Sequence, residues 1–247
     1  MKHAEVSPSS LHRILACPGS LDANRDRPHT TNAYSVQGTT AHALLELCLV
    51  TGADPSTYTG VVLDEGLIPI EDEMPECVNY AIDFVRAYVA NNLGTVVQTE
   101  VSLAFGSQVK CADDVAFGTA DIVLDNWPKE VIAIDYKHGQ GVAVSVDKNP
   151  QLMAYLLGKR AERKYQRYQA VVVQPRVRGR RPVQESPKMT DAQLGKWAKG
   201  AAPVIKIALS PDAPKVTGSH CRYCAADGNC SAQYASVTAS AAKEFGL

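Results

Sequence analysis

The sequence lacks any run of 18 or more apolar residues, so no segment of it is expected to cross a membrane. The first 15 residues contain no long apolar core, and a secretory signal is therefore not expected. An excess of positive charge is also missing, because the formal net charge is −1. That balance excludes a globally basic nucleic-acid-binding protein but permits a local basic track. Together these absences predict a cytoplasmic protein.

No G-x(4)-G-K-[ST] motif is present, so the chain has no P-loop motor of its own. Internal repeats and low-complexity tracts are missing as well. What the chain does have is 247 residues, 45% of them hydrophobic, which is enough for one large domain or two small ones with a real core. Its seven cysteines are an odd number in a chain expected in the cytosol, so a disulfide framework is not predicted.

Apolar periodicity and capping residues predict an α/β fold around a mixed sheet. Thr39 or Thr40 is the expected cap of the first long helix, and Gly52 follows its end. Asn149-Pro150 and Thr190 mark the starts of two later helices. Segments 30–37, 51–70 and 175–188 are expected to be loops. Helices are predicted over 7–20, 38–50, 75–92, 151–163 and 191–209, and strands over 96–105, 117–125, 131–137 and 170–174.

Two carboxylates and a lysine fall on adjacent predicted strands. In a hairpin that places Asp125 opposite Val131, Asp121 faces Asp135. Side chains alternate along a strand, so Lys137 shares a face with Asp135. Two opposed carboxylates repel each other unless positive charge lies between them. The hairpin therefore predicts a divalent metal site beside Lys137. The opposite face is apolar and consists of Ile122, Leu124, Ile132 and Ile134.

Other polar residues extend this constellation. His42 lies on the first long helix, and Gln151 and Tyr155 share one face of a later helix. Glu46 is a rival ligand, and Glu100 is either a supporting acid or a solvated strand end. Oxygen ligands suit Mg²⁺ or Mn²⁺, and Mn²⁺ tolerates an imidazole. Such an ion beside a lysine is suited to the hydrolysis of a phosphodiester.

The ordered motifs G-x(3)-H, G-T-A-D, D-Y-K and Q-x(3)-Y resemble those of the RecB-like branch of the PD-(D/E)XK nuclease superfamily. The resemblance implies a restriction-endonuclease-like core, in which helices flank a mixed central sheet. It further implies metal ligation by His42, Asp121 and Asp135, with the Tyr136 carbonyl as a further ligand. Lys137 would position or activate water. Gln151 and Tyr155 would support the site and the DNA backbone.

Three cysteines occur within ten residues near the C-terminus, in the pattern Cys221-x(2)-Cys224-x(5)-Cys230. Cys17, in a Cys-Pro-Gly turn, is the best candidate for a fourth ligand. Cys48 and Cys77 lie on apolar helix faces, where a free cysteine behaves as a small hydrophobe. Four thiolates bind either zinc or an iron–sulfur cluster, and coordination chemistry alone does not choose between them.

The cysteine arrangement resembles that of AddB-type and CRISPR-associated RecB-like nucleases, which implies a [4Fe–4S] cluster, with structural Zn²⁺ as the alternative. The chain would then divide into a nuclease core with an N-terminal helical region at 1–210 and a cysteine segment at 211–247 that closes onto Cys17. The whole pattern is most similar to phage and prophage nuclease-like proteins. This likeness places the protein in the cytoplasm of a bacterium or of a phage-infected host.

Basic residues are concentrated downstream of the predicted site, where they are expected to hold DNA phosphates. Tyr165 and Tyr168 are candidates for base stacking. Contacts with the backbone alone would give little sequence preference. The other reading is a solvated helix face followed by a mobile basic loop. The track consists of Lys159, Arg160, Arg163, Lys164, Arg167, Arg176, Arg178, Arg180 and Arg181.

These features together predict a metal-dependent deoxyribonuclease that acts as an exonuclease on single-stranded or frayed DNA ends, without a covalent intermediate. A separate helicase or recombination protein is the expected partner. One alternative is a non-catalytic DNA-binding or recombination partner with a vestigial core, against which the intact Asp121, Asp135 and Lys137 argue. Another is a zinc-ribbon-like scaffold that binds protein.

Overall fold

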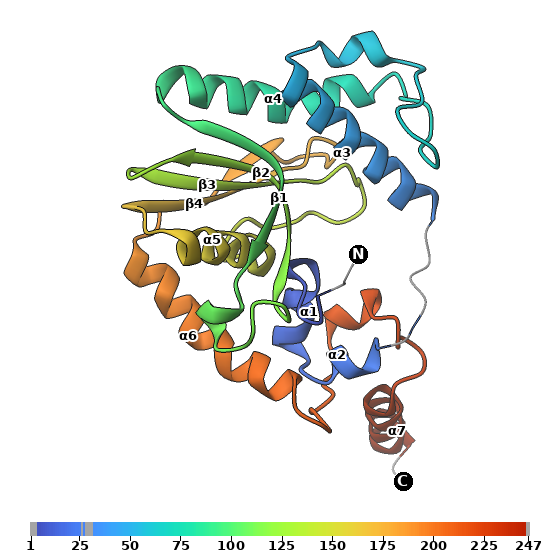
Figure 1. The fold of residues 1–247 in the computed structure, drawn as a ribbon. Coiled ribbons are helices and arrows are strands. Elements are labelled where there is room, and N and C mark those ends of the chain that lie inside the picture. Colours follow the sequence, from blue (N-terminus) through green and yellow to red (C-terminus); the bar gives the residue numbers. More distant parts are fainter. Residues whose placement is uncertain (1–3, 26, 28–31, 246–247) are drawn as a thin grey trace.

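The computed structural model describes residues 4–25, 27 and 32–245. Its centre is a sheet of five strands in the order β1-β2-β3-β4-β5. Strands β3 and β4 are parallel, and the other neighbouring pairs are antiparallel. The predicted mixed α/β fold is therefore confirmed (Figure 1). The strands are β1 (Val96–Ala104), β2 (Phe117–Asn126), β3 (Glu130–Tyr136), β4 (Arg167–Val173) and β5 (Val183–Glu185).

The β2–β3 hairpin has the register that the sequence predicts. Asp125 pairs with Val131, and the ladder continues to Ile122 opposite Ile134. Asp121 and Asp135 lie one residue beyond this last pair, at the end of the sheet away from the hairpin turn. Here the strands stop exchanging backbone hydrogen bonds, which leaves polar groups free for other partners.

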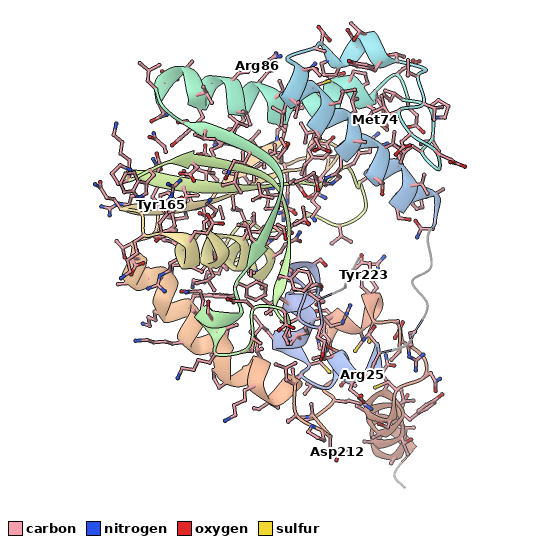
Figure 2. All side chains as sticks on the ribbon, viewed as in Figure 1. Arg25, Met74, Arg86, Tyr165, Asp212 and Tyr223 are labelled. Atoms are coloured by element: carbon pink, nitrogen blue, oxygen red, sulfur yellow. The ribbon has the colours of Figure 1, made fainter. Side chains whose placement is uncertain are left out.

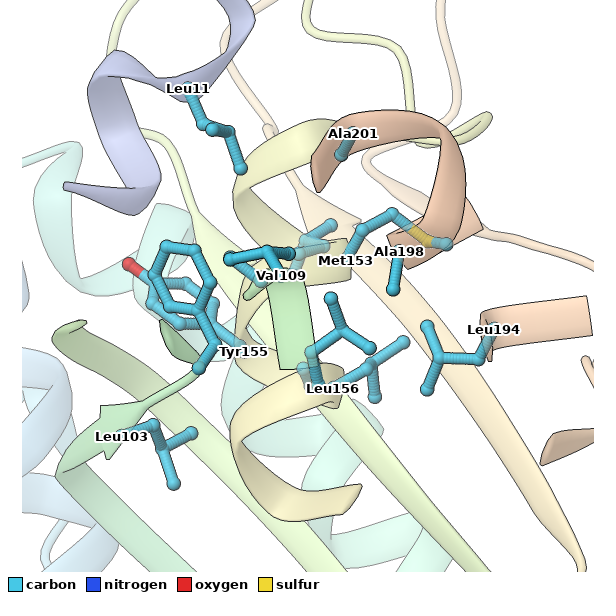
Figure 3. Close-up of a cluster of buried hydrophobic side chains, with 14 of the residues drawn as sticks. Leu11, Leu103, Val109, Met153, Tyr155, Leu156, Leu194, Ala198 and Ala201 are labelled. Carbon is cyan, nitrogen blue, oxygen red and sulfur yellow. The ribbon is translucent and has the colours of Figure 1, made fainter. Parts of the chain in front are cut away.

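Helices cover both faces of the sheet (Figure 1). Helices α3 (Ala33–Thr51) and α4 (Met74–Asn91) pack on one face, and α5 (Pro150–Glu162) and α6 (Asp191–Ala208) pack on the other. Alternate side chains of the hairpin enter the two cores, as the period of a strand requires. The apolar face predicted from the sequence meets α3 and α4. Val123, Val131 and Ala133 join the core shown in Figure 3.

Helix α3 begins earlier than the sequence predicts. Its cap is Asn32, whose side chain accepts a hydrogen bond from the Ser35 backbone N–H while Ser35 reciprocates. The predicted loop over 30–37 is therefore wrong from residue 33 onward, and residues 30 and 31 lie outside the described part. The reciprocal asparagine–serine cap is the local reason for the early start. Gly52, with φ of 75°, ends the helix as predicted.

The other long helices follow their predicted caps. Asn149 caps α5, Thr190 caps α6, and Gly94 with φ of 85° follows α4. Several elements were not predicted, among them one strand and one helix. Strand β5 forms inside the expected irregular segment 175–188, and helix α7 (Ser231–Phe245) follows the cysteine pattern. In the described part of the chain, no helix combines the length and apolar character that a membrane span needs.

The N-terminal helices and the C-terminal cysteine segment lie side by side (Figure 1). Helices α1 (Leu11–Ala16) and α2 (Ser20–Ala23) form the N-terminal part, and the segment after α6 runs back to them. The Gly19 N–H donates to the Pro214 carbonyl over 2.9 Å, and the Arg13 guanidinium donates to the Tyr223 carbonyl over 3.2 Å. These bonds bring the N-terminal cysteine turn to the C-terminal cysteine segment.

Candidate metal and cysteine sites

A possible metal site lies where the hairpin strands stop pairing. His42 on α3, Glu100 on β1 and Asp121 on β2 each offer a ligand atom, and these atoms all lie within 4.8 Å of one another. Among the described residues, no other group of three or more His, Cys, Asp and Glu side chains has its ligand atoms this close together. An imidazole and two carboxylates are a donor set suited to Mn²⁺ or Mg²⁺.

Glu100 is the member of this group that the sequence did not single out as a metal ligand. It has φ of 48°, in the left-handed region, and the β1–β2 pairing is interrupted at its position. A left-handed glutamate is locally unfavourable, and such strain is concentrated at functional sites. The neighbouring pairs Thr99–Ile122 and Val101–Ala120 place Glu100 opposite Asp121. Strand pairing between β1 and β2 would have been the signal for this ligand.

Asp121 is held from two sides. One carboxylate oxygen, Oδ2, accepts a hydrogen bond from the Tyr136 N–H over 2.8 Å. The other, Oδ1, lies 3.5 Å from Nδ1 of His42. The His42 ring also packs edge-on against the Tyr136 ring, with 5.6 Å between centroids. The hairpin and α3 therefore orient this pair of ligand groups toward each other.

Asp135 is buried beside the group, with 1% of its surface exposed. Its Oδ1 receives the Lys137 ammonium at 2.9 Å and the Gln151 amide at 2.8 Å. Its Oδ2 is buried and has no hydrogen-bond partner. A buried carboxylate oxygen without a partner is costly unless a cation or a proton is supplied. Asp135 lies outside the group of three, so its predicted role as a metal ligand stays a prediction.

Gln151 and Tyr155 are brought to the site by α5. The Gln151 amide nitrogen also donates to the Tyr155 hydroxyl over 3.1 Å, and its oxygen accepts from Lys137 over 3.4 Å. Gln151 therefore binds both members of the Asp135–Lys137 pair. Four of the five predicted catalytic residues, Asp135, Lys137, Gln151 and Tyr155, form one connected network, and Asp121 is bonded to the backbone N–H of Tyr136 between Asp135 and Lys137.

The charges of the site are unfavourable without a cation. Burial raises the pKa values of Asp121 and Asp135 to about 6. Burial and the nearby Asp121 raise the pKa of Glu100, and burial with the neighbouring Lys137 lowers the pKa of His42. Burial alone would lower the pKa of Lys137, but Asp135 and Asp121 outweigh it and raise that pKa. Lys137 is therefore a fixed positive charge at neutral pH, and a divalent ion would further favour the ionised forms of the acids.

The four cysteines of the predicted cluster line one small cavity between the chain ends. Figure 2 shows sulfur atoms in this region, between the labelled Tyr223 and Arg25. The seven cysteines of the chain are all free thiols. Within the described residues, no three cysteine sulfurs lie within 4.8 Å of one another. The thiols of Cys17, Cys221, Cys224 and Cys230 thus surround a common space without close contact.

Backbone and side-chain N–H groups point at two of these sulfurs. The Val216 N–H donates to Cys17 Sγ over 3.2 Å, and the Asn24 side-chain amide donates to Cys224 Sγ over 3.2 Å. The Asn24 oxygen also accepts the Ala225 N–H over 2.7 Å. Asn24 therefore ties α2 to the C-terminal cysteine segment. Cys48 and Cys77 are buried on helices, as expected of small hydrophobes.

The predicted basic track is wrong at Lys159, which is buried, and three other members are paired with acids. Lys159 is 2% exposed and binds Asp125 and Glu162. A buried, paired ammonium offers no contact to DNA. Arg160 binds Asp191, Arg163 binds Asp125, and Arg176 binds Glu73.

Of the remaining predicted DNA-binding residues, the two tyrosines are buried and the basic residues are exposed. Tyr165 and Tyr168 are buried in the core, so their predicted role in base stacking is wrong. Sequence alone missed these contacts because Asp125, on a distant strand, binds Lys159, Arg163 and Tyr165. The exposed members of the track are Arg163, Lys164, Arg167, Arg178, Arg180 and Arg181.

Comparisons with known proteins give a family and a distant structural likeness. Residues 3–247 match the family model described as "Protein of unknown function (DUF2800)". A solved structure described as "Crystal structure of SSO0001" is 14% identical, with a TM-score of 0.33. That match covers 91% of this chain and 95% of the other chain.

Proposed function

Starting from the membership of this chain in the DUF2800 family, we propose that it is a metal-dependent deoxyribonuclease. The observation that carries the proposal is the convergence of His42, Glu100 and Asp121 beside the Asp135–Lys137 pair. The resemblance of the four sequence motifs to those of RecB-like nucleases supports the proposal. From the same resemblance we propose that the fold is a restriction-endonuclease-like core. The reaction is hydrolysis of a phosphodiester bond.

The donor atoms suit Mg²⁺ or Mn²⁺. His42, Glu100 and Asp121 would hold the ion, with the free Oδ2 of Asp135 as a further oxygen ligand. The fit rests on that buried, unpartnered oxygen and on carboxyl groups whose burial disfavours their charge. When bound, such an ion polarises a phosphate oxygen and lowers the pKa of a bound water.

Lys137 supplies positive charge where the scissile phosphate gathers negative charge. The nearby carboxylates of Asp135 and Asp121 raise its pKa, which favours its role as a protonated, electrostatic group. Asp135 and Gln151 hold the ammonium from two sides. Tyr155 in turn fixes Gln151 through the hydrogen bond between them. The chain thereby positions its cation before the substrate arrives.

The proposed substrate is DNA with single-stranded or frayed ends, held through its phosphates. The candidates for these contacts are the exposed residues Arg163, Lys164, Arg167, Arg178, Arg180 and Arg181. Backbone contacts of this kind carry little sequence information. Because the chain has no P-loop motif, a separate helicase or recombination protein would open duplex ends.

A [4Fe–4S] cluster held by Cys17, Cys221, Cys224 and Cys230 is proposed to join the two ends of the chain. The shared cavity and the N–H groups directed at two sulfurs support this assignment. The resemblance of the cysteine arrangement to that of RecB-like nucleases supports the cluster, with structural Zn²⁺ as the alternative.

The proposed nuclease activity is tested with end-labelled single strands, with and without blocked ends, in Mn²⁺. Lys137→Ala and Asp135→Ala are expected to lower the cleavage rate by about 10²-fold or more, as loss of a charge-stabilising group does elsewhere. Glu100→Gln is expected to weaken Mn²⁺ binding by about 10-fold or more, because a carboxylate ligand loses its charge.

Lys110→Ala is the matched control, because Lys110 is exposed and lies outside the site. It is expected to cleave like the wild type. Undiminished cleavage in both Lys137→Ala and Asp135→Ala would place the chemistry elsewhere. Wild-type protein that binds Mn²⁺ and DNA without cleaving would favour the non-catalytic alternative.

A further inference from the structure

An apolar cavity of about 640 Å³ opens between α1, α5 and α6, away from the metal site. Its volume lies within the range of about 300–1,000 Å³ that is usual for ligand pockets. On α5, Met153 lines the cavity whereas Gln151 binds Asp135, so the two sites use different faces of one helix. The apolar lining comes from Leu15, Met153, Met189, Trp197, Ala201 and Val204.

The rim of the cavity is positive. Lys148 and Lys196 line it, and both are exposed. No carboxylate of the described residues forms an ion pair with either ammonium, in contrast to Arg160 of α5, which binds Asp191. Helix α6 adds Lys199 and Lys206, and its single acid is that same Asp191. An apolar hollow flanked by unpaired cations complements an occupant that is both apolar and acidic.

We propose that this cavity docks an acidic segment of a partner protein through an apolar or aromatic anchor side chain. Peptide grooves commonly combine one buried anchor with charged contacts at the rim. A nucleobase fits the lining less well, because its polar edges need partners and Gln193 is the one uncharged polar side chain in the lining. The rim lysines would meet the acidic residues of the segment, and Trp197 and Met153 would meet its anchor.

Gly200 provides a way to fill the cavity without disturbing the fold. It lies on α6 and lines the cavity, and a Cβ added there meets nothing within 4 Å. Gly200→Leu therefore projects an apolar side chain into open space, and it replaces a poor helix former by a good one. Loss of binding in this variant cannot come from unfolding if its thermal stability is equal or higher.

The test is selection of random displayed dodecapeptides on the full-length protein, followed by affinity measurements on the enriched peptides. We expect sequences with several Asp or Glu residues around a Phe, Trp or Leu. Gly200→Leu and Lys196→Glu are expected to weaken their binding by about ten-fold or more. The matched control is Lys199→Glu, which makes the same charge change on α6 outside the cavity lining and is expected to change the affinity by less than about two-fold.

Other outcomes overturn the proposal. These are no enrichment, enrichment of basic peptides, or binders that tolerate Gly200→Leu. Single-stranded DNA binding that is lost in Gly200→Leu and Lys196→Glu would assign the cavity to nucleic acid. A dimer in light scattering that Gly200→Leu dissociates would assign it to a second copy of this chain. Strand cleavage by Gly200→Leu is expected to equal that of the wild type, so this test is separate from that of the nuclease proposal.

Discussion

The carboxyl groups of Asp121 and Asp135 titrate close to neutral pH because burial removes water from their charged forms. An unfolded aspartate has a pKa of about 3.9. Between that value and about 6, the folded metal-free protein holds protons that the unfolded chain has released. The contribution of these groups to stability is therefore fully present below the unfolded pKa, and it is lost as the pH rises through about 6.

We expect Asp135→Asn to remove part of this pH dependence. In the presence of a chelator, we compare the free energy of unfolding of the wild type with that of the variant. This difference should decrease by an amount on the order of 2 kcal/mol between about pH 4 and pH 7. Urea denaturation at several pH values measures it. Asp83→Asn, on the exposed face of α4, is the control and should leave the dependence unchanged. A difference that stays flat with pH would contradict the raised pKa of Asp135.

Metal binding should reverse the effect, because Mn²⁺ needs the deprotonated carboxylates. Added Mn²⁺ is therefore expected to stabilise the wild type strongly near pH 7 and much less near pH 5, below the pKa of about 6. The same dependence on pH is expected to involve Glu100, because its left-handed backbone brings a third acidic group to the ligand atoms of His42 and Asp121.

At the scale of elements, each strand and helix of the site is oriented by a local signal. The hairpin register places Asp121 and Asp135 at one end of the sheet. Helix α5 begins at the Asn149 cap, whose side chain accepts hydrogen bonds from the Gln151 and Leu152 N–H groups. The start of α5 therefore controls where Gln151 meets Asp135 and Lys137.

Two helix caps offer a matched pair of variants. Asn149→Ala and Thr190→Ala each remove a side-chain cap, at α5 and α6 respectively, and each should cost about 1 kcal/mol of stability. Only Asn149→Ala is expected to slow strand cleavage, by about ten-fold, because Gln151 follows the cap directly. Denaturation and initial rates at saturating Mn²⁺ measure the two effects. Equal rates in the two variants would show that the α5 cap does not position Gln151.

At the scale of the whole molecule, the chain ends close on each other beside the helices that cover one face of the sheet. A link across about 200 residues removes conformational freedom from the unfolded chain. Asn24 is the side chain that joins α2 to the Cys224 loop, through one N–H···S bond and one bond to the Ala225 N–H. The cavity lined by the four cysteines and the candidate metal site are formed by different elements of the fold.

Replacement of Asn24 tests this connection. Asn24→Ala is expected to lower the iron content of anaerobically purified protein by about half or more and to hasten bleaching near about 400 nm in air, because Cys224 loses its support. Mn²⁺ affinity should stay within about two-fold, because the variant leaves the donors of the metal site intact. Asn91→Ala, at the end of α4, is the control. Unchanged iron content and air stability would show that Asn24 has no role at the cysteines. A colourless, zinc-loaded wild type would show that the cysteines bind zinc and not a cluster.

Much of the site could be predicted because strand alternation, hairpin register and helix caps, which are local features of the sequence, place its residues. The Asp121–Asp135 opposition follows from alternation and hairpin register, and α5 follows from its Asn-Pro start. The early start of α3 was missed because an asparagine–serine cap is a weak signal beside two threonines. Strand β5 has three residues, too few for an alternating pattern to identify it.

The sequence by itself determined the mixed α/β class and the hairpin register, because these depend on strand periodicity and on pairing between neighbouring segments. Only the tertiary structure decided that Glu100 lies with His42 and Asp121 in the possible metal-binding group and that Lys159 is buried. Both outcomes depend on which distant segment lies opposite, Asp121 for the first and Asp125 for the second. Such pairings between distant segments follow from packing of the whole chain, which local patterns do not encode.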